Sequence, residues 1–367
     1  MTTELAIDAR WLKTGIGRYT QSLLPGLRGH LPGIRISCIA QSRDASMVSE
    51  FVDHVTVCDA GIYGIREQLE LPRLSRKAAA LYMPHYNIPL LWRGGLLVTI
   101  HDLNHLLDKG YRNTWRSRLY ARPLLRKAVE KADVIVTPSG YTMLRLQQEF
   151  RVDPSRIRVI PCCVAPCFTR TEKPAARARI ARNQAISRPY ILFVGSCAPN
   201  KNLHLLLTAV ATLCERRADT PLLVVVGSRG KWEPKTQLRL QAMEQRKQVV
   251  RVDQPADSLL ADLYSAALMT VMPSFEEGFG LPVIESMACG TPVLCSRAAS
   301  LPEVAGDAAL YFSPYSSEEL TAAIEKLIDS SSTQARLIRA GVVRAADFSQ
   351  KDFCRRQASA IRAVLPN

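Results

Sequence analysis

The sequence predicts an α/β protein of two domains, each built on a parallel sheet with helices packed against it. The chain has 367 residues, of which 47% are hydrophobic, so it is long enough for two separate cores. Short apolar runs alternate with helical patterns along the chain, which is typical of strand–helix–strand units. Each half opens with a strand, a loop of small residues and a helix, which is the arrangement of a phosphate-binding turn.

The strands of the first domain, predicted over residues 1–169, are short apolar runs between polar loops. We expect strands over residues 5–7, 34–40, 55–57, 79–83, 96–100, 133–137 and 157–160, and helices over residues 19–27 and 140–150. Gly15 and Gly17 lie in the loop between the first strand and its helix. This is a weak phosphate-binding signal, because the third glycine of the dinucleotide fingerprint is missing.

Two histidines follow directly after strands of this first domain. His85 comes after the strand 79–83, and the pair His101-Asp102 comes after the strand 96–100. Ligands bind at the carboxyl ends of parallel strands, so these side chains are candidates for a functional site. His105 has no such context and is expected to be incidental.

The second domain is predicted over residues 189–347, after a charged and Ala-rich linker over residues 170–188 that holds one surface helix. Its expected strands cover residues 190–194, 222–226, 249–252, 268–272 and 291–295, and its expected helices include one from residue 202 and those over residues 316–329 and 333–347. The last segment, residues 348–367, has a helical pattern and no following strand with which to pair.

The most informative stretch is residues 273–290, which read PSFEEGFGLPVIESMACG. A buried strand leads into a Gly-rich loop, and a helix then opens at Leu281-Pro282 and closes at Gly290. Free N–H groups and the helix dipole make such a loop an anion site, most often for phosphate. Glu277 on the loop and Glu285 one turn into the helix are expected to face one crevice. For either residue alone, the alternative is an ordinary strand–turn–helix joint with a solvated face.

The string EGFGLPVIE, followed by MACGTPV and LPEVAGDAALYF, resembles the retaining glycosyltransferases of family 4. The resemblance extends over essentially the whole chain and is strongest in its C-terminal half. It implies an α/β fold of the GT-B type, in which two Rossmann-like domains face each other across a cleft. It also implies that the C-terminal helix crosses back onto the N-terminal domain. The Glu-x7-Glu signature of the family falls on Glu277 and Glu285.

The same resemblance implies roles for single residues. His101 would contact the donor sugar, Glu277 would hold sugar hydroxyls, and Glu285 would accept hydrogen bonds from the ribose. Lys201 takes the second position of the family's basic pair, whereas Ser196 stands at the first position, which is often Arg. The diphosphate therefore has one cation fewer, unless another basic residue compensates. The candidates for that compensation are Arg18 and Arg229.

The remaining positions that the resemblance implies are backbone and loop positions. For donor binding they are Gly15, Gly17, Gly227, Gln254, Phe279, Gly280 and Leu281, and for acceptor binding they are His85 and Asp102. The Asp-x-Asp metal pair of the other large glycosyltransferase class is absent from the sequence. We therefore expect a metal-independent transferase without a cofactor, in which Lys201, loop amides and a helix dipole neutralise the leaving diphosphate.

The expected donor is GDP-mannose, with UDP- or dTDP-sugars as alternatives, and the expected acceptor is a glycan or a lipid-linked oligosaccharide. Within the same fold, a nucleotide-sugar epimerase or a phosphorylase is a further alternative. The phosphorylase would need a pyridoxal-binding Lys motif, which the sequence lacks. From a different class, the alternative is a basic RNA- or lipid-surface-binding protein with a degenerate site. An intact set of Lys201, Glu277 and Glu285 argues against degeneracy.

The charge balance points to an anionic partner. A total of 48 Lys and Arg against 33 Asp and Glu gives a net charge of +15. Residues 112–126 place Trp115 and Tyr120 among basic residues, a pattern that fits either contact with a membrane surface or a solvated helix. No recognisable nucleic-acid module accompanies the charge, so nucleic acid is not an expected partner.

Nothing in the sequence predicts a membrane span or a signal peptide, so we expect a cytoplasmic protein, peripheral at most at the inner face of the plasma membrane. The ten cysteines are scattered along the chain. Cys162, Cys163 and Cys167 lie together without a second ligand pair at zinc spacing. Buried free thiols are therefore expected in place of disulfides or a metal site.

Overall fold

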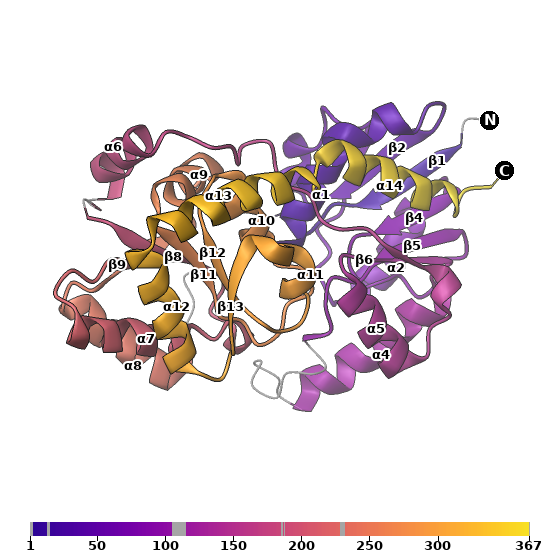
Figure 1. Cartoon of the computed structure of the whole chain (residues 1–367). Coiled ribbons are helices and arrows are strands. Elements are labelled where there is room, and N and C mark those ends of the chain that lie inside the picture. The colour runs from indigo at the N-terminus through magenta and orange to yellow at the C-terminus, as the bar shows by residue number, and fades with distance from the viewer. Residues whose placement is uncertain are drawn as a thin grey trace. The chain divides into compact units, whose positions relative to one another are not determined.

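The computed structural model describes residues 3–12, 15–104, 115–184, 186, 188–227 and 232–366, with the backbone alone for residues 115–121, 183 and 184. The chain divides into two units (Figure 1). The described part of the first unit consists of residues up to 104, residues 115–163 and residues 349–366, and the second unit contains residues from 164 to 348.

The first unit is built on a seven-stranded parallel sheet in the order β3-β2-β1-β4-β5-β6-β7. Its strands are β1 (Glu4–Asp8), β2 (Arg35–Ala40), β3 (His54–Val57), β4 (Ala80–Met83), β5 (Gly95–Thr99), β6 (Val134–Thr137) and β7 (Ile157–Val159). Most residues of β1, β2, β4, β5 and β6 are buried, as expected for a parallel sheet with helices packed on it. The seven strands that the sequence predicts in this half are all confirmed.

Five α-helices of the first unit lie in the described residues. They are α1 (Gly15–Leu27), α2 (Ile65–Leu74), α4 (Trp115–Lys131), α5 (Gly140–Phe150) and α14 (Gln350–Arg362). The last of these follows the whole second unit in sequence, yet it packs against α1 (Figure 1). The contact is close, because a Cβ added to Gly26 of α1 would lie 2.7 Å from the Cys354 sulfur. The prediction that the C-terminal helix returns to the N-terminal domain is thus confirmed.

The second unit has a six-stranded parallel sheet in the order β10-β9-β8-β11-β12-β13. The strands are β8 (Tyr190–Val194), β9 (Leu222–Gly227), β10 (Val249–Asp253), β11 (Met269–Met272), β12 (Val293–Ser296) and β13 (Ala309–Phe312). The helices are α6 (Lys173–Gln184), α7 (Leu203–Arg216), α8 (Pro234–Gln245), α9 (Asp257–Ala266), α10 (Leu281–Ala288), α11 (Leu301–Ala305), α12 (Ser317–Asp329) and α13 (Ser331–Ala346). Strand β13 was not predicted from the sequence.

Both sheets have the strand order of a Rossmann-like fold. In each, the order reverses direction at an inner strand pair: β1 next to β4 in the first unit, and β8 next to β11 in the second. Ligands of open α/β sheets bind outside the carboxyl ends of the strands at such a switch point. The loops that follow these four strands are therefore where a site is expected.

Two segments differ in detail from the sequence-based expectation. Helix α1 begins at Gly15, four residues before the predicted start, so Gly15 and Gly17 belong to its first turn. The expected linker, residues 170–188, contains α6, which packs against α9. Ala176 and Ile180 of α6 are fully buried in one apolar cluster with Tyr264 of α9, so this helix is only partly a surface helix.

All ten cysteines are free, and Cys162 and Cys163 are buried. Burial raises the pKa of the Cys163 thiol to about 12, so this thiol stays protonated and unreactive near neutral pH. Cys167 is exposed, unlike the buried thiol expected at this position. Across the described residues, none of the helices is long and apolar enough to cross a membrane.

Candidate active site

The Gly-rich loop of residues 273–280 lies at the switch point of the second sheet, between β11 and α10. Gly280 has φ +108°, and a Cβ at this position would lie 2.7 Å from a methyl carbon of Leu301. Only glycine fits this turn without strain. Pro282 stands in the first positions of α10, where its missing N–H costs nothing. Gly290 has φ +73° after the helix ends, so the predicted strand–loop–helix is confirmed.

Glu277 is buried and forms an ion pair with Lys201. The Lys201 Nζ lies 2.7 Å from Oε1 and 2.9 Å from Oε2 of the carboxylate. The Ser274 hydroxyl also donates to Oε1, at 2.7 Å. An ammonium has three N–H donors, so two hydrogen bonds to Glu277 leave one donor for another acceptor. The Lys201 side chain is 20% exposed and Glu277 8%, so the pair is only partly screened by water.

Lys201 lies at the end of a short 3₁₀ turn, Pro199–Lys201, and α7 begins two residues later, at Leu203. The residue between them, Asn202, has φ +52°, so the chain bends sharply before the helix. The predicted helix start near residue 202 is confirmed. Lys201 itself, however, precedes the helix, because this bend separates it from the first turn.

Asparagines fix the loop 198–202 to the Gly-rich loop. The Asn200 amide donates to the Glu276 carbonyl at 2.9 Å, and the Phe275 N–H donates back to the Asn200 carbonyl at 2.8 Å. The Asn202 amide donates to the Pro273 carbonyl at 3.0 Å. The loops after β8 and β11 are therefore one connected structure. Sequence reasoning missed Asn200, although its place beside Lys201 in a loop after a strand was a signal.

Glu285 has different partners from Glu277. It lies on α10, is 2% exposed, and accepts a hydrogen bond of 2.8 Å from the Tyr264 hydroxyl of α9. The Ser300 hydroxyl instead lies near the loop, 2.9 Å from the Glu277 carbonyl and 2.8 Å from the Phe279 carbonyl. Phe279 is itself buried and packs edge-on against Phe348. Neither Tyr264 nor Ser300 was predicted from the sequence.

The other donor-binding candidates of the second unit occupy loop and strand ends. Gly227 ends β9, and a Cβ there would lie 2.3 Å from the Gly195 carbonyl oxygen. The close approach of these two backbone segments is therefore enough to require glycine at this position. Gln254 is exposed, has φ +42°, and donates its N–H to the Gly227 carbonyl at 3.1 Å. Ser196 is exposed in the loop after β8, and Leu281 is the first residue of α10. Arg229 lies outside the described residues.

His101 follows β5 in the first unit and has two defined neighbours. Its Nε2 donates to the Pro84 carbonyl at 2.9 Å, and its ring meets the Tyr19 ring edge-on at 4.8 Å. Burial lowers the pKa of His101, so the imidazole is neutral at pH 7, with Nδ1 left as an acceptor. The Tyr19 hydroxyl bonds to Tyr82 at 2.9 Å and accepts from the Gln357 amide of α14.

His85 and Asp102 have mainly structural contacts. The His85 ring is buried and lies 4.4 Å from the Trp11 ring and 4.0 Å from the Tyr86 ring. Asp102 accepts the Asn104 N–H at 2.9 Å, which fixes the turn after β5. Of the two N-terminal glycines, Gly17 is required by packing, because a Cβ there would lie 2.0 Å from the Leu12 carbonyl oxygen. Gly15 has open space around it.

A buried ion network at the carboxyl end of β1 was not anticipated from the sequence. Arg10 is 2% exposed and bonds to both Asp8 oxygens, at 2.9 and 3.0 Å, and to Glu67 at 3.0 Å. The Asn87 amide donates to the other Glu67 oxygen at 2.7 Å. This network connects the loops that follow β1 and β4, which is the switch point of the first sheet.

The fold and the contacts at the two switch points indicate an α/β protein that binds a phosphate-bearing ligand. Each sheet has loops at its switch point that are fixed by buried polar contacts, and in the second unit a buried carboxylate holds a lysine beside a helix N-terminus. A cation and free N–H groups at that position suit a phosphate-bearing ligand. The described residues contain no group of three His, Cys, Asp or Glu side chains that could hold a metal ion.

Comparison with known proteins gives the family. Residues 14–166 match the family model "Glycosyltransferase Family 4", and residues 177–343 match "Glycosyl transferases group 1". The chain belongs to glycosyltransferase family 4, whose members have the GT-B fold. Both halves of the resemblance found in the sequence are thereby confirmed.

The similar proteins include glycosyltransferases with different names. O-antigen chain mannosyltransferase B of Escherichia coli is 31% identical over 255 residues, 69% of this chain and 66% of that protein. D-inositol 3-phosphate glycosyltransferase of Corynebacterium glutamicum is 29% identical over 268 residues, 71% and 64%. The chain thus spans just under two thirds of their lengths. The crystal structure of Anabaena HepE with UDP-glucose is similar in fold, with a TM-score of 0.80, 16% identity and coverage of 99% and 100%.

Proposed function

We propose that this protein is a retaining, metal-independent hexosyltransferase that transfers mannose from GDP-mannose to a lipid-linked or oligosaccharide acceptor in the assembly of a bacterial surface polysaccharide. The observation that carries the proposal is the Lys201–Glu277 pair at the switch point of the second sheet. It lies within the region that matches the glycosyltransferase model. The mannosyl donor is supported by the name of the Escherichia coli relative.

The contacts support a proposed role for three residues of the second unit. Lys201, with one N–H donor beyond its bonds to Glu277, would bind the diphosphate together with the N–H groups at the start of α10. Glu277 would hold the sugar hydroxyls and keep the ammonium in place. Glu285, fixed by Tyr264, would accept hydrogen bonds from the ribose. These are charge-assisted contacts, which are the stronger class of hydrogen bond.

In the proposed reaction, the bond from the anomeric carbon to the phosphate oxygen breaks, and a bond to the acceptor oxygen forms on the same face of the sugar. The acceptor's hydroxyl proton passes to the departing phosphate, so no protein nucleophile is needed. Lys201 stabilises the negative charge that develops on that phosphate. Neutral His101 would contact the donor sugar, and His85 and Asp102 are assigned to the acceptor side.

The donor is tested by thermal unfolding with a panel of GDP-, UDP-, dTDP- and ADP-sugars. GDP-mannose should raise the melting temperature most, because at equal concentration the ligand with the lowest dissociation constant stabilises the native state most. A larger shift with a UDP-sugar, the kind of sugar nucleotide present in the Anabaena crystal structure, would change the proposed donor and leave the proposed reaction unchanged. No shift with any member of the panel would contradict the function and favour a surface-binding protein with a degenerate site.

Lys201→Ala should weaken binding of the nucleoside diphosphate by about 1.5–3 kcal/mol, the range for a hydrogen bond to a charged group. Turnover should fall as well, since the same cation stabilises the leaving phosphate. Calorimetry with the free nucleotide measures the first effect and steady-state kinetics the second. Lys326→Ala, which removes an exposed lysine from α12, is the matched control. Equal binding by both variants would show that Lys201 serves only to neutralise Glu277.

Transfer activity should be unchanged after treatment with EDTA and dialysis. The reason is that Lys201 and backbone N–H groups take the place of a metal ion in the proposed site, and the sequence lacks the Asp-x-Asp pair. Activity is measured before and after chelation, and again with added Mg²⁺ or Mn²⁺. Activity that disappears with EDTA and returns only with a divalent cation would contradict this assignment.

We also propose that α4 brings the protein to the anionic inner face of the plasma membrane. Its described apolar residues, including Leu124 and Val129, are buried, whereas Arg122, Arg126 and Lys127 are exposed. Each basic side chain near such a surface contributes about 1 kcal/mol. Co-sedimentation should therefore be stronger with anionic than with neutral vesicles and should weaken with salt. Equal binding to both vesicle types would rule the proposal out. Residues 112–114 and the side chains of Trp115 and Tyr120 lie outside the description.

A further inference from the structure

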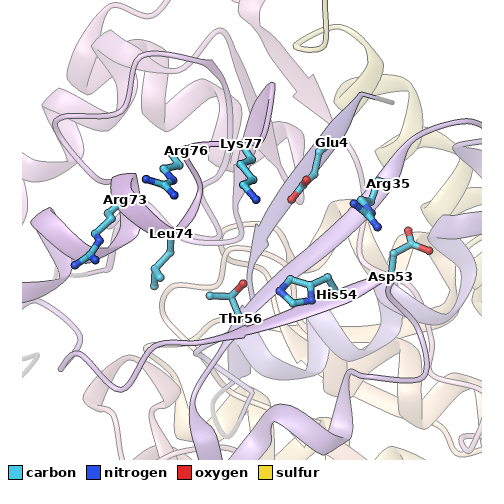
Figure 2. A pocket seen from close by; sticks show the side chains of 9 residues that line it. All are labelled: Glu4, Arg35, Asp53, His54, Thr56, Arg73, Leu74, Arg76 and Lys77. Atoms are coloured by element: carbon cyan, nitrogen blue, oxygen red, sulfur yellow. The ribbon is translucent and has the colours of Figure 1, made fainter. Parts of the chain in front are cut away.

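A basic cavity of about 460 Å³ opens in the first unit at the amino ends of β1, β2 and β3. Figure 2 shows the side chains that surround it, which come from the start of these strands, from the end of α2 and from the turn after α2. The lining residues are Glu4, Arg35, Asp53, His54, Thr56, Arg73, Leu74, Arg76 and Lys77.

The backbone brings these residues to one edge. Glu4 pairs with Arg35 across the first two strands, and Ser37 of β2 pairs with His54 of β3. On the other side of β1, the Ala79 N–H donates to the Glu4 carbonyl at 2.8 Å. The turn after α2, which carries Arg76 and Lys77, is therefore held next to the start of β1.

Positive charge exceeds negative charge in this cavity. Arg35, Arg73, Arg76 and Lys77 contribute four cations, and none of them has a carboxylate within ion-pair distance in the described part of the chain. Of the two carboxylates, Asp53 is already engaged: one oxygen accepts from Arg28 at 2.9 Å and the other from the Ile36 N–H at 2.8 Å. Four like charges around a depression repel one another unless an anion lies between them.

The cavity lies at the opposite end of the sheet from the candidate site residues of the first unit. The candidates of the first unit follow the carboxyl ends of strands, whereas this cavity is at the amino ends. Strand β1 has five residues, so the two ends of the sheet are about 16 Å apart at 3.3 Å per residue. An anion bound here would not contact His85, His101 or Asp102, the candidate residues of the first unit.

We infer that this cavity binds a phosphate-bearing molecule separate from the sugar donor. Three of its four cations are arginines, whose planar guanidinium groups bind phosphate oxygens in pairs. Its volume falls within the range of small-molecule sites. The lining contains no Trp, Tyr or Phe, so it offers no aromatic surface on which a nucleobase could stack. The ligand is a compact phosphate or pyrophosphate group, supplied either by a soluble phosphate ester or by a lipid headgroup.

The test compares two triple variants of the full chain with the same loss of charge. Arg35→Gln/Arg76→Gln/Lys77→Gln removes three of the four cavity cations and leaves Arg73, and Arg216→Gln/Arg246→Gln/Lys351→Gln removes three other exposed cations as the control. Calorimetry with inorganic pyrophosphate probes a soluble ligand, and co-sedimentation with phosphatidylglycerol vesicles probes a headgroup. Both variants keep the proposed donor site, so pyrophosphate bound there contributes equally to each. Thermal unfolding without ligand checks that both are folded.

In the cavity variant, the dissociation constant for pyrophosphate at this cavity should rise at least tenfold, whereas in the control variant it should stay unchanged. Loss confined to vesicle binding would identify the headgroup as the source and would equally support the site. Equal behaviour of the two variants in both assays would overturn the inference, since binding would then follow net charge alone. Should the cavity variant unfold, Arg76→Gln and Arg246→Gln give the same comparison with one charge each.

Discussion

Glu277→Gln should lower kcat by about 10²–10⁴-fold, the effect of losing a preorganised electrostatic group, while the variant binds free nucleoside diphosphate almost normally. The donor sugar flattens and gains positive charge as its bond to phosphate breaks, and the carboxylate stabilises that charge. The amide oxygen of glutamine still accepts a hydrogen bond from Lys201, so the ammonium keeps its position. Steady-state kinetics and calorimetry with the free nucleotide measure the two effects.

Glu285→Gln should fail differently, because the proposed partner of Glu285 is the ribose, which does not change during transfer. Binding lost equally from the ground state and the transition state raises KM more than it lowers kcat. This variant should therefore bind the free nucleotide more weakly than wild type. Tyr264→Phe removes the 2.8 Å hydrogen bond that fixes Glu285 and should shift KM in the same direction.

Glu276→Gln is the control, since it changes the neighbouring loop residue, which is not buried. If Glu285→Gln lowers kcat and Glu277→Gln raises KM, the two roles are reversed. If all three glutamine variants behave like wild type, these carboxylates belong to an ordinary strand–turn–helix joint, and the proposed site is wrong.

Arg10→Met should reduce the free energy of unfolding by about 3–5 kcal/mol, the usual cost of removing one partner from a buried ion pair. Asp8 and Glu67 would both remain buried after the change, with no cation between them. Urea unfolding measures the loss. Arg93→Met, at an exposed position of the same unit, should stay within about 0.5 kcal/mol of wild type.

A second substitution separates electrostatics from packing at Arg10. Adding Glu67→Gln to Arg10→Met removes one of the unpaired charges and should recover part of the lost stability. No recovery in the double variant, or a loss below 1 kcal/mol for Arg10→Met alone, would show that the network contributes little to stability.

Local patterns in the sequence were sufficient for the Gly-rich loop and for twelve of the thirteen strands in the described residues, all except β13. Apolar runs such as residues 190–194 have the length of a buried strand and are too short for a buried helix. The φ of +108° at Gly280 follows from the need for a tight turn before α10. The resemblance to family 4 added the return of the C-terminal helix, which no local pattern could have placed.

Contacts between distant residues could not be predicted in this way. Arg10 and Glu67 are 57 positions apart, Lys201 and Glu277 are 76 apart, and Tyr264 and Glu285 belong to different helices. A charged residue in a sequence is normally expected at the surface, so the burial of Arg10 had no local signal. Loops meet at a switch point because of strand order, which becomes known only with the structure.

The position of α14 has a consequence for how the chain is made. The ribosome synthesises the entire second unit, residues 164–348, before it reaches this helix. Until then Tyr19 lacks the Gln357 amide, and α1 lacks the helix that covers it. Because His101 rests against Tyr19, its surroundings are complete only after α14 has been synthesised. The unit that begins first in translation thus receives its last helix only after the other unit has been synthesised.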